Sequence, residues 1–108
     1  MVLDTSELLK SCDIRGHGGA GKSGSDIVCA AVSVLARTAQ AVLAKREGII
    51  TKSTASRRGE FTLETEAQSK TGEDFLLAAG TFLIEGLAGV AEEYPENCSM
   101  TITKERRN

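Results

Sequence analysis

The chain has 108 residues, enough for one domain, because two halves of that length would each be too small to close a hydrophobic core. Its 13 basic and 15 acidic residues give a net charge of −2, which argues against a free-standing nucleic-acid binder. With no Trp, one Tyr and three Phe, it also lacks the aromatic surface on which single-stranded nucleic acid stacks.

The first half of the chain predicts strands, a loop and a helix. Met1–Leu3 predicts the stub of a strand, and Leu8–Arg15 predicts a full strand because apolar residues partly alternate along it. The high glycine density of Gly16–Gly24 predicts a loop. Apolar residues at spacings of three, four and seven then predict a helix over Asp26–Lys45, which Gly48 stops.

The second half predicts a hairpin, a helix and a last strand. Gly48–Ser53 and Glu60–Glu66 are strand-like and close enough to form an antiparallel hairpin, and Gln68–Gly72 predicts a polar loop. Asp74–Glu93 predicts a helix that is apolar nearly all round, with an apolar stretch too short for a membrane span. We therefore expect it to be buried against the sheet and also against the first helix or a second subunit. Cys98–Thr103 alternates and predicts the last strand.

The order of these elements is (β)-β-α-β-β-α-β. It predicts an α+β fold in which a small mixed, largely antiparallel sheet packs with two helices. We expect residues 1–108 to form a single domain.

The cysteines predict a reducing compartment. Cys12, Cys29 and Cys98 are far apart and include no C-x-x-C pair, so we expect neither a disulfide framework nor a zinc site, and no other cofactor. Cys12 and Cys98 lie on predicted strands and are expected to be structural. The first 15 residues show no basic start followed by an apolar run, so we expect a cytoplasmic protein.

The glycine-rich loop matches the nucleotide-binding pattern G-x-x-x-x-G-K-[ST] at Gly16–Ser23, between a predicted strand and a predicted helix. The rest of the chain fits that interpretation poorly. A P-loop fold needs a parallel sheet with several βαβ crossovers, whereas a hairpin follows the first helix here. No apolar strand after this loop ends in an Asp that would supply the second magnesium ligand. Nucleotide binding is therefore the less favoured interpretation.

A second pattern in the same region indicates a thiol site. Cys29 lies near the start of the predicted helix, where backbone amides favour a thiolate. His17 lies twelve residues upstream on the glycine loop, which can bring the imidazole to the sulfur as an acid–base partner. Asp26 and Ser33, three residues before and four after the cysteine, can share its face of the helix, and Asp26 can orient His17 or cap the helix.

The residues alone leave two interpretations of this pair open. Cys29 can equally be a small buried thiol in an Ala-rich helix, and His17 can be an ordinary loop histidine. In the catalytic interpretation the loop glycines free backbone amides to act as an oxyanion hole. These glycines are Gly16, Gly18, Gly19, Gly21 and Gly24.

The string Gly-His-Gly-Gly-Ala-Gly at 16–21, followed by Gly-Ser-Asp-Ile-Val-Cys-Ala-Ala-Val-Ser at 24–33, resembles the ribosomal-processing cysteine protease family (Prp, also called YsxB-like). The stretch 86–95 is also similar to that family, and the likeness covers nearly the whole chain. The resemblance implies a cytoplasmic bacterial cysteine endopeptidase, usually a homodimer, that removes a short N-terminal extension from a large-subunit ribosomal protein. It implies Cys29 as nucleophile, His17 as general base and acid, and a mobile loop between them that closes over the substrate.

This sequence departs from the family pattern at two places. Gly18 replaces the usual Ala after the histidine, and the first strand is nearly absent, which leaves one sheet edge exposed or covered by a partner. The alternative function is a non-enzymatic ribosome-assembly or ribosome-binding module. Its basic residues would be Arg57-Arg58 and Lys104–Arg107. We otherwise expect no membrane and no direct nucleic-acid binding.

Overall fold

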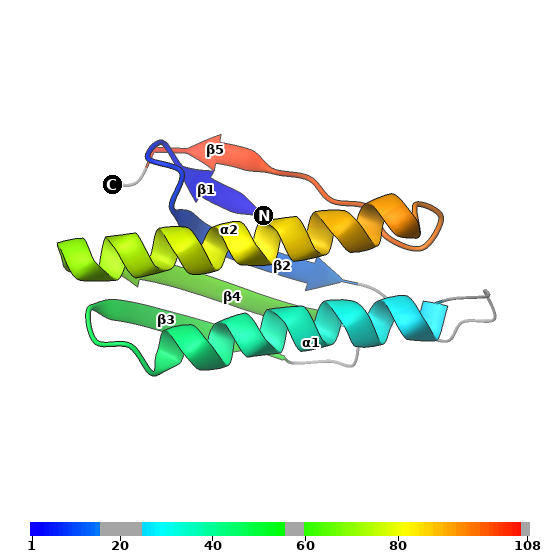
Figure 1. Cartoon of the computed structure of the whole chain (residues 1–108), viewed down its shortest axis with the longest axis horizontal. Helices are drawn as coiled ribbons and strands as arrows, with labels where there is room; N and C mark the ends of the chain where they lie inside the picture. The colour runs from blue at the N-terminus through cyan, green and yellow to red at the C-terminus, as the bar shows by residue number, and fades with distance from the viewer. Residues whose placement is uncertain (16–24, 56–59, 107–108) are drawn as a thin grey trace.

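In the computed structural model, which describes residues 1–15, 25–55 and 60–106, a five-stranded sheet carries two helices on one face (Figure 1). The predicted α+β class and element order are confirmed. In chain order the elements are β1 (Val2–Asp4), β2 (Leu9–Arg15), α1 (Ser25–Ala44), β3 (Ile49–Thr54), β4 (Glu60–Ala67), α2 (Lys70–Glu93) and β5 (Thr103–Glu105).

The sheet is mixed and largely antiparallel, as predicted. Its strand order is β3-β4-β2-β1-β5, and only the pair β1–β5 is parallel. The hairpin of β3 and β4 keeps one register from the pair Ile49↔Ala67 to the pair Thr54↔Thr62. β2 and β1 shift register after Val2, so the ladder is irregular near that edge of the sheet. The central strand β2 leads into the glycine-rich segment that precedes α1.

β1 is short, as the sequence indicates, but it is not an edge strand. The expectation of an exposed or partner-covered edge is wrong, because β5 of the same chain covers β1 through the pairs from Val2↔Thr103 to Asp4↔Glu105. The α-amino group of Met1 also donates a hydrogen bond of 2.9 Å to the carbonyl oxygen of Thr101. Two ion pairs also connect β5 to neighbouring parts of the same chain: Lys10–Glu105 and Lys104–Glu7.

The hydrophobic core lies between the sheet and the two helices, which run antiparallel to each other (Figure 1). α1 packs over β3, whereas α2 packs over β4, β2 and β3. Each helix buries one apolar stripe against the sheet, formed by Val28, Ala36 and Leu43 on α1 and by leucines on α2. The largest fully buried side chains are Leu9, Leu43, Leu63, Leu76 and Leu83.

Two element boundaries differ from prediction. α2 begins at Lys70, so the loop predicted over Gln68–Gly72 is wrong for its last three residues; Ser69 caps the helix and accepts a hydrogen bond of 3.0 Å from the Gly72 amide. β5 begins at Thr103 and not at Cys98. Residues 98–102 do not belong to β5, because the ladder between β1 and β5 begins with the pair Val2↔Thr103.

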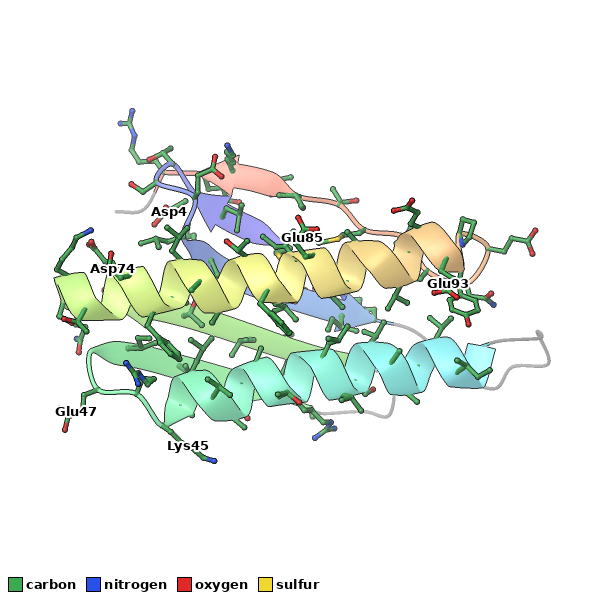
Figure 2. All side chains as sticks on the ribbon, in the orientation of Figure 1. Asp4, Lys45, Glu47, Asp74, Glu85 and Glu93 are labelled. Carbon is green, nitrogen blue, oxygen red and sulfur yellow. The ribbon has the colours of Figure 1, made fainter. Side chains whose placement is uncertain are left out.

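The outer face of the helix layer is unusually apolar. Contrary to the expectation for the second helix, its stretch Lys70–Glu93 is long and apolar enough to cross a membrane by length and composition, as is Ile27–Ala44 in α1. Both helices nevertheless lie on the sheet and bury apolar side chains against it. Phe82 is 73% exposed and Val34 is 64% exposed. Charged side chains lie instead at the C-terminal end of α1, where Figure 2 shows Lys45 and Glu47 pointing outward in the connection to β3.

Candidate active site

Cys29 is the fifth residue of α1, and it is half-buried. The first amides of an α-helix have no acceptor inside the helix, so the amides of 25–27 in the first turn of α1 lie just before this cysteine without an intrahelical acceptor. The Cα–Cβ bond of a helical residue tilts toward the N-terminus, which is the positive end of the helix dipole. The Cβ of Cys29 therefore points toward the N-terminal turn of α1.

The contact between the helices shows which side of α1 carries Cys29. A Cβ built on Gly86 of α2 would lie 2.9 Å from Cδ2 of Leu35, so Leu35 faces α2. At 3.6 residues per turn, Cys29 lies about 120° around the helix from Leu35, and Ser33 about 160°. Both residues are half-buried. They lie on the flank of α1 away from α2, over the β3 side of the sheet.

The predicted site residues fall into two groups. Cys29 and Ser33 are one turn apart on α1, as the i, i+4 spacing predicts, and Asp26 is the second residue of the same helix. His17 and the five loop glycines lie outside the described residues. They are Gly16, Gly18, Gly19, Gly21 and Gly24.

The other two cysteines lie in different surroundings. Cys12 is buried in the core on β2, and this burial raises the pKa of its thiol, with the charge of Asp13 adding to the increase against the opposing charge of the N-terminus. Cys98 is half-buried after the C-terminal end of α2, where its amide donates to the carbonyl oxygen of Tyr94 at 2.9 Å. All three thiols are free. The buried position of Cys12 agrees with the structural role predicted for it.

The sheet does not have the arrangement of a nucleotide-binding P-loop fold. β2, the strand that precedes the glycine-rich segment, is antiparallel to both of its neighbours, β1 and β4. A P-loop follows a strand of a parallel sheet. The sequence at Gly16–Ser23 therefore matches the nucleotide pattern, but the sheet is not that of a P-loop fold.

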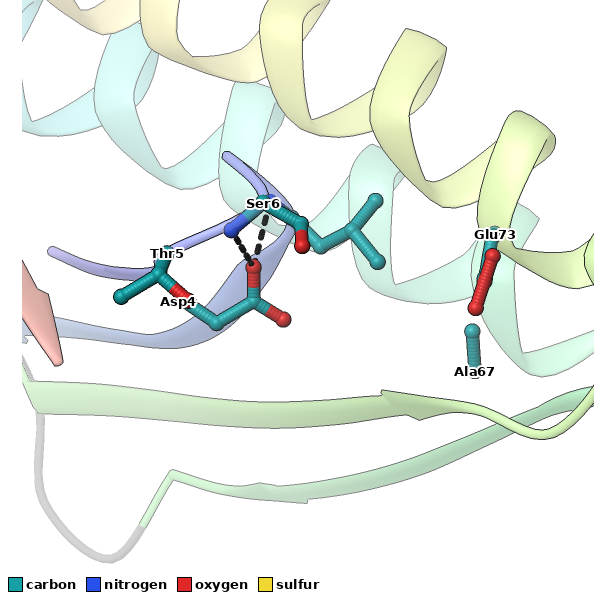
Figure 3. A pocket seen from close by; sticks show the side chains of 6 residues that line it. Asp4, Thr5, Ser6, Ala67 and Glu73 are labelled. Carbon is teal, nitrogen blue, oxygen red and sulfur yellow. Dashed lines mark hydrogen bonds between the residues drawn. The ribbon is translucent and has the colours of Figure 1, made fainter. Parts of the chain in front are cut away.

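A cavity of about 280 Å³ lies at the other end of the helix layer, beside the first turn of α2 (Figure 3). Oδ1 of Asp4 accepts hydrogen bonds from the amides of Ser6 at 2.8 Å and Leu8 at 3.1 Å, so this carboxylate fixes the turn between β1 and β2. An Asp followed by Thr-Ser after a short strand is the signal that could have predicted this turn. The cavity is lined by Asp4, Thr5, Ser6, Leu8, Ala67 and Glu73.

Metal binding finds no support in the described ranges, where no three His, Cys, Asp or Glu side chains lie close enough to hold an ion. The side chains of α1 include the thiol of Cys29 and, one turn later, the hydroxyl of Ser33.

Solved structures share this fold. The Streptococcus mutans protein SMU.848 has a TM-score of 0.78 at 24% identity, covering 96% of this chain and 90% of that one. The ribosomal processing protease Prp of Staphylococcus aureus in complex with a substrate peptide has a TM-score of 0.77 at 19% identity, covering 94% and 93%. The same enzyme with a covalently linked product peptide has a TM-score of 0.73 at 19% identity, covering 96% and 94%.

No curated protein matches the sequence. The family model described as cysteine protease Prp matches residues 1–99, which is most of the chain. This protein therefore belongs to the cysteine protease Prp family.

Proposed function

We propose that this protein is a cytoplasmic cysteine endopeptidase that removes a short N-terminal extension from a large-subunit ribosomal protein during ribosome maturation. The observation that carries the proposal is the position of Cys29 in a chain of this family, half-buried behind the free amides of α1. The Staphylococcus aureus relative carries a covalently linked product peptide. A covalent peptide adduct is what a nucleophilic thiol forms during peptide hydrolysis.

In the proposed mechanism the Cys29 thiolate attacks the scissile carbonyl carbon, and a sulfur–carbon bond forms. Amides at the start of α1 stabilise the oxyanion. The carbon–nitrogen bond then breaks, and the leaving amine takes a proton from His17. His17 next takes a proton from water, whose oxygen attacks the thioester and releases the thiolate. Ser33 and Asp26, on the same helix, support this pair.

The test is cleavage of a synthetic peptide that covers the first twenty or so residues of the host's ribosomal protein, followed by mass spectrometry. We expect Cys29→Ala to lower the rate by on the order of 10³-fold or more, as removal of a nucleophile does in comparable enzymes. Cys98→Ala is the matched control, because Cys98 is also a free, half-buried thiol. Cleavage by Cys29→Ala at the wild-type rate would contradict the proposal.

We further propose that the protein is a homodimer joined through the outer face of its helix layer. Phe82, four residues before Gly86, lies on the side of α2 that meets α1, and Val34 lies on the outer side of α1. The charges of α1, Asp26 and Arg37, balance each other, whereas α2 carries more acidic than basic residues, so Arg37 of one copy can face Glu85 of the other. A two-fold axis that pairs α1 with α2 of the second copy covers the apolar side chains and brings opposite charges together.

The alternative of a non-enzymatic ribosome-binding module would use basic residues of which the structure describes two, Lys104 and Arg106. Of its proposed basic residues, Lys104 is engaged by Glu7. Arg57-Arg58 lies outside the described part of the chain.

A further inference from the structure

The two edges of the sheet are built differently. The β5 edge is three residues long, carries Lys104 and Glu105 in ion pairs, and lies beside an irregular β1–β2 ladder. Short length, charge and irregular pairing are the features that keep a strand edge from accepting another strand. β3 is the opposite edge and has six residues in unbroken register with β4, five of them β-branched or small, and no proline. In the described part of the chain β3 pairs with β4 alone.

The hydrogen-bonding phase of β3 shows which backbone groups point to its free edge. The amide of Gln68 donates to the carbonyl oxygen of Gly48 at 2.7 Å, so these directly opposite residues form a hydrogen-bonded pair at the start of the ladder. In an antiparallel ladder such pairs alternate with non-bonded ones. The amides and carbonyls of Thr51 and Ser53 therefore point away from β4. The side chains of these two residues point toward the helices, since their ladder partners Thr65 and Leu63 are buried.

The flank of α1 that carries the thiol lies above this same edge. Cys29, Ser33 and Gln40 recur on the side of α1 away from α2, and all three are half-buried. β3 begins where α1 ends and runs antiparallel to it (Figure 1). The six residues of β3 span five steps of about 3.3 Å each, which equals the length of about eleven helical residues. Counted back from the end of α1 at Ala44, β3 therefore ends roughly at the level of Ser33. Cys29 is about one turn beyond.

We infer that the substrate peptide binds as an extended strand on the free edge of β3, beneath the flank of α1 that carries Cys29 and Ser33. The inference rests on the proposed endopeptidase function and adds where and in which conformation the substrate lies. The peptide pairs with the free amides and carbonyls of Thr51 and Ser53. Every second peptide side chain faces α1, and the chain reaches the thiol about two residues past the end of β3. The regular edge and the nucleophile thereby contact the same extended peptide.

The first experiment removes one edge amide. Thr51→Pro deletes a donor that takes no part in the β3–β4 ladder, and proline is tolerated on an edge strand at such a position. We expect kcat/KM for the ribosomal-protein peptide to fall about ten-fold or more, since a hydrogen bond is lost and the ring obstructs the edge. Lys52→Val is the matched control, because it changes the next residue of β3 and keeps the edge amides of Thr51 and Ser53. Alkylation of Cys29 by iodoacetamide should proceed at the wild-type rate in both variants, since that reagent does not need β3.

The second experiment leaves the protein unchanged and so does not depend on a variant's folding. Peptides methylated at one backbone nitrogen at a time should lose cleavage with a period of two residues, because only alternate peptide amides face β3. A folded Thr51→Pro protein with wild-type kcat/KM, or a methylation pattern without this period, would overturn the inference.

Hydrogen exchange separates failure of the inference from failure of the proposed function. If the wild-type protein cleaves no ribosomal-protein peptide, the function proposal fails. The same peptide added to the Cys29→Ala protein still decides the edge-binding question. Slower amide exchange at Thr51 and Ser53, with little change at Lys52 and Thr54 in the ladder, supports edge binding. Unchanged exchange at Thr51 and Ser53 overturns it.

Discussion

Gly72 in the first turn of α2 lies against Gly48, so closely that a side chain at Gly72 has no room. A Cβ built there would overlap the carbonyl oxygen of Gly48 and would lie 3.0 Å from its carbonyl carbon. Gly48 itself has a φ of +81°, a left-handed conformation that favours glycine. The same residue accepts the hydrogen bond that starts the β3–β4 ladder. The turn after α1, the start of β3 and the start of α2 thus meet at two glycines.

Gly72→Ala should therefore destabilise the protein by about 2 kcal/mol or more, since backbone atoms must move to admit the methyl group. Gly89→Ala on the same helix is the matched control, because a Cβ at Gly89 meets nothing within 4 Å. There alanine should stabilise the protein by about 0.5–1 kcal/mol through its higher helix propensity. Urea denaturation followed by circular dichroism measures both. If Gly72→Ala and Gly89→Ala changed stability equally and with the same sign, Gly72 would not be in close contact with Gly48 as described.

Asp4 is 5% exposed and holds the β1–β2 turn through two backbone amides. Asp4→Ala should cost about 2–3 kcal/mol, because hydrogen bonds to a charged group are lost and two amides lose their acceptor. Asp13→Ala removes an exposed carboxylate that pairs with Arg15 and should change stability by less than about 0.5 kcal/mol. A chemical denaturation series at pH 7 compares the two variants. Equal costs would show that the turn does not depend on Asp4.

Burial raises the pKa of the Cys12 thiol above its ordinary value of 9.0. The unfolded chain therefore releases this proton at a lower pH than the folded protein does. Stability from this group is fully present below the unfolded pKa and is lost as pH rises from about 9 toward the folded pKa. The free energy of unfolding should fall more steeply between pH 8.5 and 10 in the wild-type protein than in Cys12→Ala. Parallel curves would show that Cys12 does not titrate differently in the two states.

The proposed dimer predicts a specific response at Phe82. Phe82→Lys should convert the dimer to monomer, because it places a charge in the apolar contact, and the expected change in the dissociation constant is on the order of 100-fold. Glu66→Lys, an exposed change on β4 at the opposite face of the sheet, should leave association unchanged. Sedimentation at several concentrations distinguishes the two. A monomeric wild-type protein, or a Phe82→Lys dimer of unchanged strength, would rule out this interface.

Periodicity and turn residues predicted the fold class well, because they are local signals. The helix over Asp26–Lys45 was predicted to within one residue of α1, since apolar spacing and Gly48 define it. The start of α2 was missed because Lys-Thr-Gly gives no apolar period there, and the Ser69 cap is evident only beside Gly48. β5 was misplaced because its bounds depend on its partner in the sheet, which lies about a hundred residues away.

The candidate site was predictable only in part. Residue spacing placed Cys29 and Ser33 on one side of a helix, because the helical period is fixed. The sequence does not show which strand lies beneath that side, since strand order is a tertiary property. The free edge of β3 became evident only once β4 was found between β3 and β2.

The pairing of β1 with β5 has a kinetic consequence. The hydrogen bond between Met1 and Thr101 joins residues 100 positions apart. Its formation closes a loop of nearly the whole chain and therefore has a large cost in conformational entropy. The hairpin and the helix pair involve shorter separations and lose less entropy. We therefore expect the three-residue ladder of β5 to form late in folding. Its amides should be among the first to open in the native state, well before those of β2 and β4.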